Sequence, residues 1–385
     1  MKDNIKQEIQ SNADFLFEIA KYLYKNPELG YAEHLACKRL TDELTARGFV
    51  VEEKICNLDT AFKAVYDSGK EGAAVAYFCE YDALPGIGHG CGHNLISAMS
   101  LGAALGLKAV IGDIGGKVVI FGTPAEETGG GKVQMTDENI FEGITVGMMA
   151  HPSTATEESG TSMAIRPVRF QFTGKAAHAA ASPEKGINAL DAVIFLFNAV
   201  NALRQHVTRD VMFHGIITAG GDAPNIVPEF AEAYFYVRAA KKSVLNEALR
   251  RVEECAYGAE KMTGAKVKIV YEPAFDDLNT NIALSEAFNH NLLNYGEKEI
   301  KKAGDGIGSI DIGNVSYSIP CIHPWIGIGD ENLVLHTKDF ADRTVAEDVK
   351  EIVVRTATAM AATGFDVITS KELRQKIEDE FLHSK

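Results

Sequence analysis

The sequence lacks the features that mark several large protein classes. Its 385 residues contain no uninterrupted apolar run of membrane-spanning length, no signal-peptide core at the N-terminus and no Lys/Arg-rich block. Basic side chains number 38 against 53 acidic ones, and the resulting net charge of −15 argues against nucleic acid or an anionic membrane as a partner. The six cysteines include no CxxC pair, which indicates reduced thiols. We therefore predict a cytoplasmic protein that binds neither nucleic acid nor membrane.

The remaining composition is typical of a globular chain. Hydrophobic residues make up 46% and charged residues 24%, and the length predicts two domains or one domain with a large insertion. Apolar residues recur at helical spacing from Asn4 to Tyr24 and again from Glu33 to Arg47. Short β-rich runs then alternate with apolar helical segments as far as Ala150, which predicts an α/β fold with a parallel or mixed sheet. In such a sheet functional side chains gather at the carboxyl ends of strands.

The middle of the chain follows a different pattern. From Val168 to Tyr271, predicted strands and helices occur in the order β-α-β-β-α-β. This is the order of a ferredoxin-like α+β unit, and a complete unit of this kind inside an α/β chain indicates an insertion. We predict an inserted domain over residues 166–276 and an outer domain made of residues 1–165 and 277–385.

A glycine-rich turn with two metal-binding residue types follows one of the predicted strands. In the segment GHGCGHN, residues 88–94, the thiol of Cys91 and the imidazole of His93 are two positions apart. Such ligands suit a first-row metal ion. A tight turn in which both side chains only pack would have the same sequence, so the motif alone leaves both interpretations open.

Two adjacent carboxylates follow the next predicted strand. The strand Val118 to Phe121 leads into PAEETGGG, residues 124–131, which contains Glu126 and Glu127. Because neighbouring side chains diverge, one carboxylate can bind a metal while the other faces a water molecule as general base. An acidic loop without a ligand is the alternative interpretation.

Two histidines complete the set of candidate ligands. His151 follows a third predicted strand, and His336 lies far downstream in LHTKDF, residues 335–340. Each alone is more often structural than a ligand, but repeated placement at strand ends favours a shared site. The five candidates together would supply enough donors for two divalent ions: Cys91, His93, Glu127, His151 and His336.

Four motifs in this order resemble a known family. EYDALPG (80–86), GHGCGHN (88–94), PAEETGGG (124–131) and HTKDF (336–340) are similar to motifs of metallopeptidases of the aminoacylase and carboxypeptidase G type. The likeness is greatest to the branch of p-aminobenzoyl-glutamate hydrolase and β-alanyl-lysine dipeptidase-like proteins, which has Asn at the position of Asn94. GKAAHA (174–179) and APNIVP (223–228) of the predicted insertion also fit, so the resemblance spans nearly the whole chain.

The resemblance implies a fold and a role for each matching residue. It implies a zinc-peptidase-like mixed-sheet catalytic domain with a ferredoxin-like lid that forms a homodimer, and two divalent ions per subunit, Mn or Zn. The five candidate ligands would bind the ions, Asp82 would contact a ligand, and Glu126 would be the general acid/base. His178 would stabilise the oxyanion in a neighbouring subunit's active site, while Asn225 and Arg238 would meet a substrate carboxylate.

The chain departs from the wider family at Glu80. Many members have a histidine there, two residues before the position of Asp82, so the departure puts a classical dizinc site in question. Manganese suits the mixed Cys, His and Glu donors at least as well, because selectivity depends on geometry and supply. The bridging ligand and the roles of Ser309 and Asp311 stay unassigned.

We therefore predict a metal-dependent amidohydrolase with a small substrate that carries a carboxylate. It would cleave the amide bond of an N-acyl or aminoacyl amino acid, such as a p-aminobenzoyl-glutamate-like conjugate or a dipeptide, through a metal-activated water with Glu126 as general base. One alternative is a thiol-dependent amidase with Cys91 as nucleophile and His89 or His93 as base, which leaves both glutamates without a role. The other is a non-catalytic, metal-stabilised binding protein.

Overall fold

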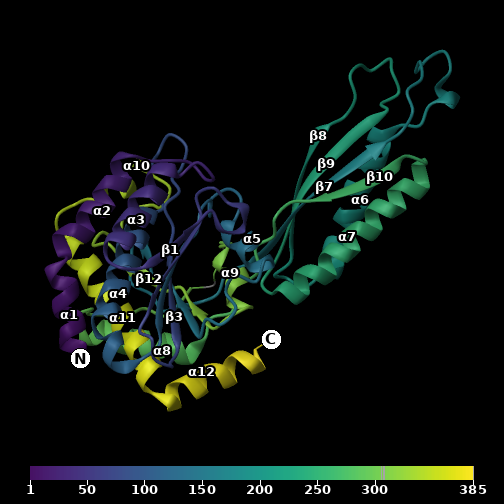
Figure 1. Cartoon of the computed structure of the whole chain (residues 1–385). Coiled ribbons are helices and arrows are strands. Elements are labelled where there is room, and N and C mark those ends of the chain that lie inside the picture. The colour runs from purple at the N-terminus through teal and green to yellow at the C-terminus, as the bar shows by residue number, and fades with distance from the viewer. Residues whose placement is uncertain (305, 307, 385) are drawn as a thin grey trace. The chain divides into compact units, whose positions relative to one another are not determined.

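The chain divides into two compact units. The computed structural model describes residues 1–304, 306 and 308–384. Unit 1 contains the described residues of 1–161, 278–306 and 311–384, and unit 2 contains those of 162–277 and 308–310 (Figure 1). Unit 2 is therefore inserted into the sequence of unit 1, and the predicted insertion of residues 166–276 falls within it.

A mixed six-stranded sheet forms the centre of unit 1. Its strand order is β1-β2-β4-β3-β5-β11. The strands are β1 (Val50–Glu53), β2 (Phe62–Asp67), β3 (Ala74–Cys79), β4 (Lys117–Gly122), β5 (Val146–Met148) and β11 (Cys321–Ile322). β4, β3, β5 and β11 run parallel, whereas β1 and β2 pair antiparallel. A separate parallel pair is formed by β6 (His151–Ser153) and β12 (Trp325–Gly327). Because the central strand β3 is buried along its whole length, it reads as the continuous apolar run AVAYFC.

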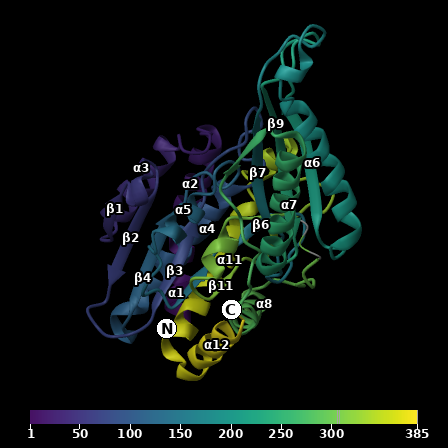
Figure 2. The ribbon, with the colours of Figure 1, turned by 90° about the vertical axis from the view of Figure 1, so that its right-hand side faces the viewer.

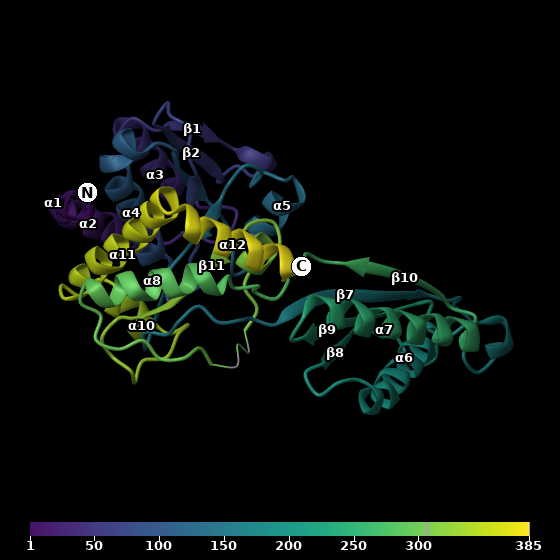
Figure 3. The same cartoon turned by 90° about the horizontal axis from the view of Figure 1, so that it is seen from below.

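Two long apolar helices pack against this sheet. α4 (His93–Ile114) and α11 (Val349–Thr369) lie side by side, and the hydroxyl of Tyr77 on β3 donates to the Met360 carbonyl of α11 over 3.2 Å. Each helix is long and apolar enough to cross a membrane, but 83% and 72% of their most apolar windows are buried, as in core helices. α8 (Ile282–Asn294) and α12 (Lys371–His383) lie beside α11 (Figures 2 and 3). The remaining helices of unit 1 are α1 (Lys2–Ser11), α2 (Ala13–Lys25), α3 (His34–Ala46), α5 (Gly131–Asp137), α9 (Ile312–Ser316) and α10 (Lys338–Arg343), with a 3-10 turn at Ile55–Asn57.

The prediction of a single helix from Asn4 to Tyr24 is wrong. The structure has two helices, α1 and α2, which meet at Asn12, where φ is −97° and ψ is 7°. The Asn12 side chain donates to the Glu8 carbonyl over 2.9 Å, and the Ser11 hydroxyl donates to the same carbonyl over 2.8 Å. Short polar side chains that bond to the backbone in this way compete with helix continuation, which apolar spacing alone does not reveal.

Unit 2 has the predicted ferredoxin-like order. It consists of β7 (Ala164–Thr173), α6 (Ala189–Leu203), β8 (Met212–Ala219), β9 (Phe230–Ala239), α7 (Lys242–Thr263) and β10 (Lys266–Tyr271), with 3-10 turns at Pro183–Lys185 and Arg204–His206. The antiparallel sheet has the order β10-β7-β9-β8. Both helices contact β7 and β9 and pack on one face (Figure 3), so β9 alternates between buried residues such as Phe235 and more exposed ones such as Tyr236. β8 is an edge strand, and its Ile216 is 61% exposed.

Candidate metal centre

The loop after β3 places Cys91 and His93 beside His151. Gly92, between them, is the N-cap of α4 and has a φ of +83°. A Cβ atom at Gly92 would lie 2.9 Å from Cγ of Pro152, so the close approach and the left-handed backbone both require glycine. This packing brings Cys91 Sγ to 3.5 Å from His151 Nε2.

A second turn, after β4, carries the two adjacent glutamates. Ala125, the residue before Glu126, has a φ of +60°, and its N–H donates to the buried carboxylate of Glu33 over 2.8 Å. The N–H of Glu127 donates to Asp82 Oδ2 over 3.0 Å. Left-handed conformations cost free energy for residues other than glycine and are concentrated at functional sites, where the surrounding structure holds them.

His336 has the same unusual backbone conformation, with a φ of +63°. Its N–H donates to the Gly90 carbonyl over 2.9 Å, which ties this distant segment to the Cys91 loop. Its Nε2 lies 3.4 Å from Oε1 of Glu127. The Cys91 loop, the glutamate turn and the His336 segment therefore meet in unit 1.

The potential ligand atoms form three overlapping groups, in each of which all atoms lie within 4.8 Å of one another. The groups are Cys91, His93 and His151; Cys91, Glu127 and His336; and His93, Glu126 and Glu127. Cys91, His93 and Glu127 each belong to two groups. Because neighbouring groups share ligands, the donors could hold two cations next to each other. All five predicted ligands and Glu126 are brought together.

His93 and His151 each turn Nδ1 toward a backbone carbonyl and Nε2 toward other candidate ligands. His93 Nδ1 lies 3.0 Å from the Asp82 carbonyl oxygen, and His151 Nδ1 lies 2.7 Å from the Pro152 carbonyl oxygen. Because a carbonyl only accepts hydrogen bonds, Nδ1 carries the proton in both rings. Nε2 is then the nitrogen that faces the centre, and in the neutral form of each ring it could bind a metal ion.

Several buried atoms in this centre have no hydrogen-bond partner within the described part of the chain. They include His93 Nε2 and Glu127 Oε1. A buried polar atom without a partner is costly, and a cation bound between these atoms would remove that cost. The donor set of one thiolate, imidazoles and carboxylates fits a divalent first-row ion. The residues present therefore fit the predicted metal.

Burial and mutual charge set the protonation of the site. Burial opposes the charged form of His93, but Asp82, Cys91 and Glu80 together raise its pKa well above the usual histidine range. Burial, with the neighbouring His323, lowers the pKa of His151. Burial, followed by the nearby carboxylates of Glu80 and Asp311, raises the pKa of Glu126 well above the usual glutamate range. These neighbours explain how one of two adjacent carboxylates can hold a proton.

The predicted substrate-binding residues lie in unit 2. His178 and Asn225 are exposed, and their segments pair, since Ala179 N–H donates to the Asn225 carbonyl over 3.0 Å. His178 Nδ1 accepts hydrogen bonds from the backbone N–H groups of Ala180 and Ala181, both over 3.2 Å. The proton of the neutral ring is therefore on Nε2. Arg238, on β9, donates to the Ser309 hydroxyl over 3.2 Å.

Sequence reasoning missed two features of the centre. Lys132 is fully buried and lies 2.6 Å from Glu80 Oε1 and 2.7 Å from Asp311 Oδ1. His323 is also buried, and its ring centroid lies 5.3 Å from that of His151. His323 directly follows β11, so the strand-end rule that indicated His151 could have found it. The sequence gives no such indication for Lys132, which follows three glycines and would be expected on the surface.

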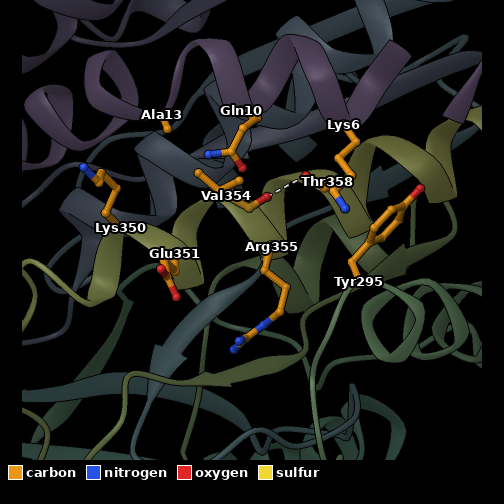
Figure 4. A pocket seen from close by; sticks show the side chains of 9 residues that line it. All are labelled: Lys6, Gln10, Ala13, Tyr295, Lys350, Glu351, Val354, Arg355 and Thr358. Carbon is orange, nitrogen blue, oxygen red and sulfur yellow. Dashed lines mark hydrogen bonds between the residues drawn. The ribbon is translucent and has the colours of Figure 1, made fainter. Parts of the chain in front are cut away.

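Two cavities in the described part of unit 1 differ in their distance along the chain from the site residues. A groove of about 680 Å³ is bordered by residues 84–88, just before the Cys91 loop, and by Lys338, just after His336. The other cavity, of about 290 Å³, lies between α1 and α11 (Figure 4), and none of the predicted site residues lines it. Its lining residues are Lys6, Gln10, Ala13, Tyr295, Lys350, Glu351, Val354, Arg355 and Thr358.

Comparisons with known proteins identify relatives of this chain. Residues 164–261 match the model of a peptidase dimerisation domain. The chain is 36% identical over 401 residues to the Xaa-Arg dipeptidase of Mus musculus, with 99% of this chain and 92% of that protein covered. It is 31% identical over 316 residues to one of the subunits of p-aminobenzoyl-glutamate hydrolase of Escherichia coli, with 77% and 65% covered. A Bacillus subtilis structure described as a dinuclear metal binding peptidase has the same fold, with a TM-score of 0.69 at 17% identity over 93% of this chain and 100% of that one.

Proposed function

Because this chain belongs to the M20 peptidase family and is a metal-dependent hydrolase of amide bonds, we propose that it is a dipeptidase with a two-metal centre and Glu126 as general acid/base. The observation that carries this proposal is the convergence of six side chains in three overlapping ligand groups. The proposed ligands are Cys91, His93, Glu127, His151 and His336.

The proposed residues would divide the work of amide hydrolysis. When bound, the ions would lower the pKa of a water molecule and polarise the amide carbonyl. Glu126, beside the ligand Glu127, would accept the proton from the attacking water and return it to the leaving amine. Its raised pKa suits the second step, because a carboxyl that holds a proton near neutral pH can donate it. His178 would stabilise the oxyanion with its Nε2 N–H.

We propose a dipeptide with a basic C-terminal residue as the substrate. The full-length likeness to a dipeptidase described as acting on Xaa-Arg supports this class. The net charge of −15 also favours a cationic substrate over a dianionic conjugate, since the field of the whole protein attracts the former and repels the latter. Arg238 would bind the α-carboxylate that every dipeptide carries. p-Aminobenzoyl-glutamate stays the second candidate, on the partial likeness to the Escherichia coli hydrolase.

We further propose that unit 2 forms the interface of a homodimer. The match to a dimerisation domain covers most of this unit. The edge strand β8 exposes backbone groups for pairing together with apolar side chains, including Ile216 at 61% and Ile217 at 46% exposure. An exposed apolar edge strand is a ready site for pairing with a second sheet. Such a dimer would allow His178 to act in a neighbouring subunit.

One experiment tests the proposed function directly. The purified protein is analysed for metal and assayed against Xaa-Arg and Xaa-Lys dipeptides, β-alanyl-lysine, N-acyl amino acids and p-aminobenzoyl-glutamate. The assays are repeated after chelation and after readdition of Mn²⁺ or Zn²⁺. We expect two ions per chain, cleavage of basic dipeptides, loss of activity with chelator and recovery with metal.

The same assays separate the two alternatives. Activity that survives chelation but is abolished by thiol alkylation would contradict the metal mechanism and favour Cys91 as nucleophile. Burial raises the pKa of the Cys91 thiol, and a buried thiol is a weak nucleophile unless a metal or base ionises it. Two bound ions with no cleavage of any compound in the panel would instead contradict the hydrolase and favour a binding protein.

A further inference from the structure

Three charged side chains from separate segments meet in a fully buried cluster next to the centre. The Lys132 ammonium lies 2.6 Å from Glu80 Oε1 and 2.7 Å from Asp311 Oδ1, and the backbone N–H of Lys132 donates to Asp311 Oδ2 over 3.2 Å. All three side chains are at most 1% exposed. A buried ion cluster seldom adds net stability over apolar packing, so its presence calls for another explanation.

The cluster leaves one carboxylate oxygen free, and that oxygen faces a proposed metal ligand. Glu80 Oε2 has no hydrogen-bond partner within the described residues, and it lies 3.4 Å from His93 Nε2, which has none either. Both atoms are electron-pair donors when His93 is neutral with its proton on Nδ1. Two buried acceptors that face each other repel unless a positive charge lies between them, which can be a proton on Nε2 or a metal ion.

The distance between these two atoms is compatible with two ligands of one ion, and Glu80 approaches the three ligand groups through His93. Two ligand atoms about 2.1 Å from one ion at a tetrahedral angle are about 3.4 Å apart. The separation of 3.4 Å between Glu80 Oε2 and His93 Nε2 matches this value. It also matches the separations within the proposed ligand set, 3.5 Å for Cys91 Sγ and His151 Nε2 and 3.4 Å for Glu127 Oε1 and His336 Nε2.

We infer that Glu80 is an additional oxygen ligand of the metal centre, and that Lys132 and Asp311 are positioning residues that present it. This inference rests on the proposed metal centre. Lys132 binds one oxygen of Glu80 and so turns the other toward His93. Asp311 shares the positive charge of Lys132, because two carboxylates face one ammonium. The cluster keeps a net charge of −1, which would attract a cation bound next to it.

The test is a titration of the metal-free full-length protein with Co²⁺, followed by its visible spectrum and by competition with a chromophoric chelator. Glu80→Gln removes the anionic oxygen but keeps the size of the side chain. We expect at least a tenfold weaker affinity for one Co²⁺ and a change in the visible bands, which report the ligands of the ion. Asp311→Asn leaves Lys132 to neutralise Glu80 alone, so we expect a smaller loss of affinity in the same direction.

A second variant and a control keep the test decisive. Glu80→Asp keeps the charge but withdraws the carboxylate by one methylene, and we expect it also to weaken binding and shift the spectrum. It replaces Glu80→Gln if that variant does not fold. Glu297→Gln removes a carboxylate from another partly buried pair of unit 1, 2.8 Å from Arg355, and should leave Co²⁺ affinity and spectrum unchanged.

Each result has a distinct meaning. Glu80 variants that bind Co²⁺ with wild-type number, affinity and spectrum would overturn this inference and leave the proposed function intact. In that case Glu80 would only accept a hydrogen bond from a protonated His93. A wild-type protein that binds no Co²⁺ would overturn the metal centre itself and the role of Glu80 with it.

Discussion

Asp82 holds His93 in a single orientation. Its Oδ1 lies 2.9 Å from His93 Nδ1, while its Oδ2 accepts the N–H of Glu127 over 3.0 Å. One carboxylate thus fixes two proposed ligands that come from the ends of different strands. Its burial raises the pKa of Asp82, but the neighbouring His93 and the Glu127 N–H lower it overall, so Asp82 is ionised in this role.

Asp82→Asn is expected to weaken metal binding by about 10- to 100-fold. Whichever way the amide is turned, its NH₂ group faces either His93 Nδ1–H or the Glu127 N–H, so it can accept only one of the two hydrogen bonds. Competition with a chromophoric chelator measures the affinity. The surface variant Asp67→Asn serves as control and should bind metal as the wild-type protein does. Unchanged affinity in Asp82→Asn would contradict the supporting role of this contact.

Glu126→Gln should lower kcat by at least about 100-fold, because it removes the proposed proton acceptor and keeps the side-chain shape. The metal content should stay at the wild-type number, since the other donors remain. Steady-state kinetics and metal analysis on one preparation check both statements. Full turnover in this variant would rule out Glu126 as general base.

The proposed action of His178 in a neighbouring subunit is tested by mixing two variants that each lack one of the proposed residues. His178→Ala and Glu126→Gln homodimers are each expected to be nearly inactive. After dissociation and reassembly, the heterodimer has one site with both an intact Glu126 and a partner that carries His178. Random mixing should therefore recover about a quarter of wild-type activity. If His178 acts in its own subunit, no activity returns.

Arg238→Ala should raise KM for a dipeptide by about tenfold or more, because a hydrogen-bonded charge pair contributes about 1.5 to 3 kcal/mol. The matched substrate is the same dipeptide with an amidated C-terminus, which offers no carboxylate and should lose much less. Arg238→Lys should restore part of the affinity. An equal loss for both substrates would show that Arg238 does not recognise the carboxylate.

His323 is expected to make the stability of the metal-free protein depend on pH. Burial lowers its pKa in the folded state to about 4, against an ordinary value near 6.5 when the chain unfolds. Between these values the unfolded state binds the proton and the folded state does not, so stability is complete above pH 6.5 and falls as the pH drops toward 4. The contribution reaches about 3 kcal/mol.

Urea unfolding at pH 7, 6 and 5 measures this dependence. His323→Asn should be less stable than the wild-type protein at pH 7, because it leaves a cavity beside His151 and Trp325. Its stability should nevertheless fall less steeply toward pH 5. Parallel curves for the two proteins would show that His323 does not titrate in this range.

Much of the fold was predictable because it depends on local patterns. The alternation of buried and exposed residues in β9 and the apolar run of β3 follow directly from the faces these strands bury. The break at Asn12 was not predictable from apolar spacing, because it depends on side-chain bonds to the Glu8 carbonyl. The domain limits and the cytoplasmic location stay predictions.

From sequence, most site residues could be predicted only where side chains that bind metals follow predicted strands. Cys91, His93, Glu127 and His151 stand out because they follow predicted strands, whereas His336 was indicated only by the HTKDF motif. The Lys132 cluster does not stand out, since Glu80, Lys132 and Asp311 come together only through the packing of three segments. Glu80 was visible as a departure from the family, but its free oxygen beside His93 is a property of the tertiary structure alone.

The hydrogen bond from His336 N–H to the Gly90 carbonyl has a consequence for biosynthesis. This bond joins a residue before the insertion to one after it, and β11, which completes the sheet, also comes after it. A growing chain that has emerged only as far as residue 277 holds Cys91, His93, Glu127 and His151 but not His336. The inserted unit must therefore be synthesised before the proposed metal centre, with His336 as one of its ligands, can be completed.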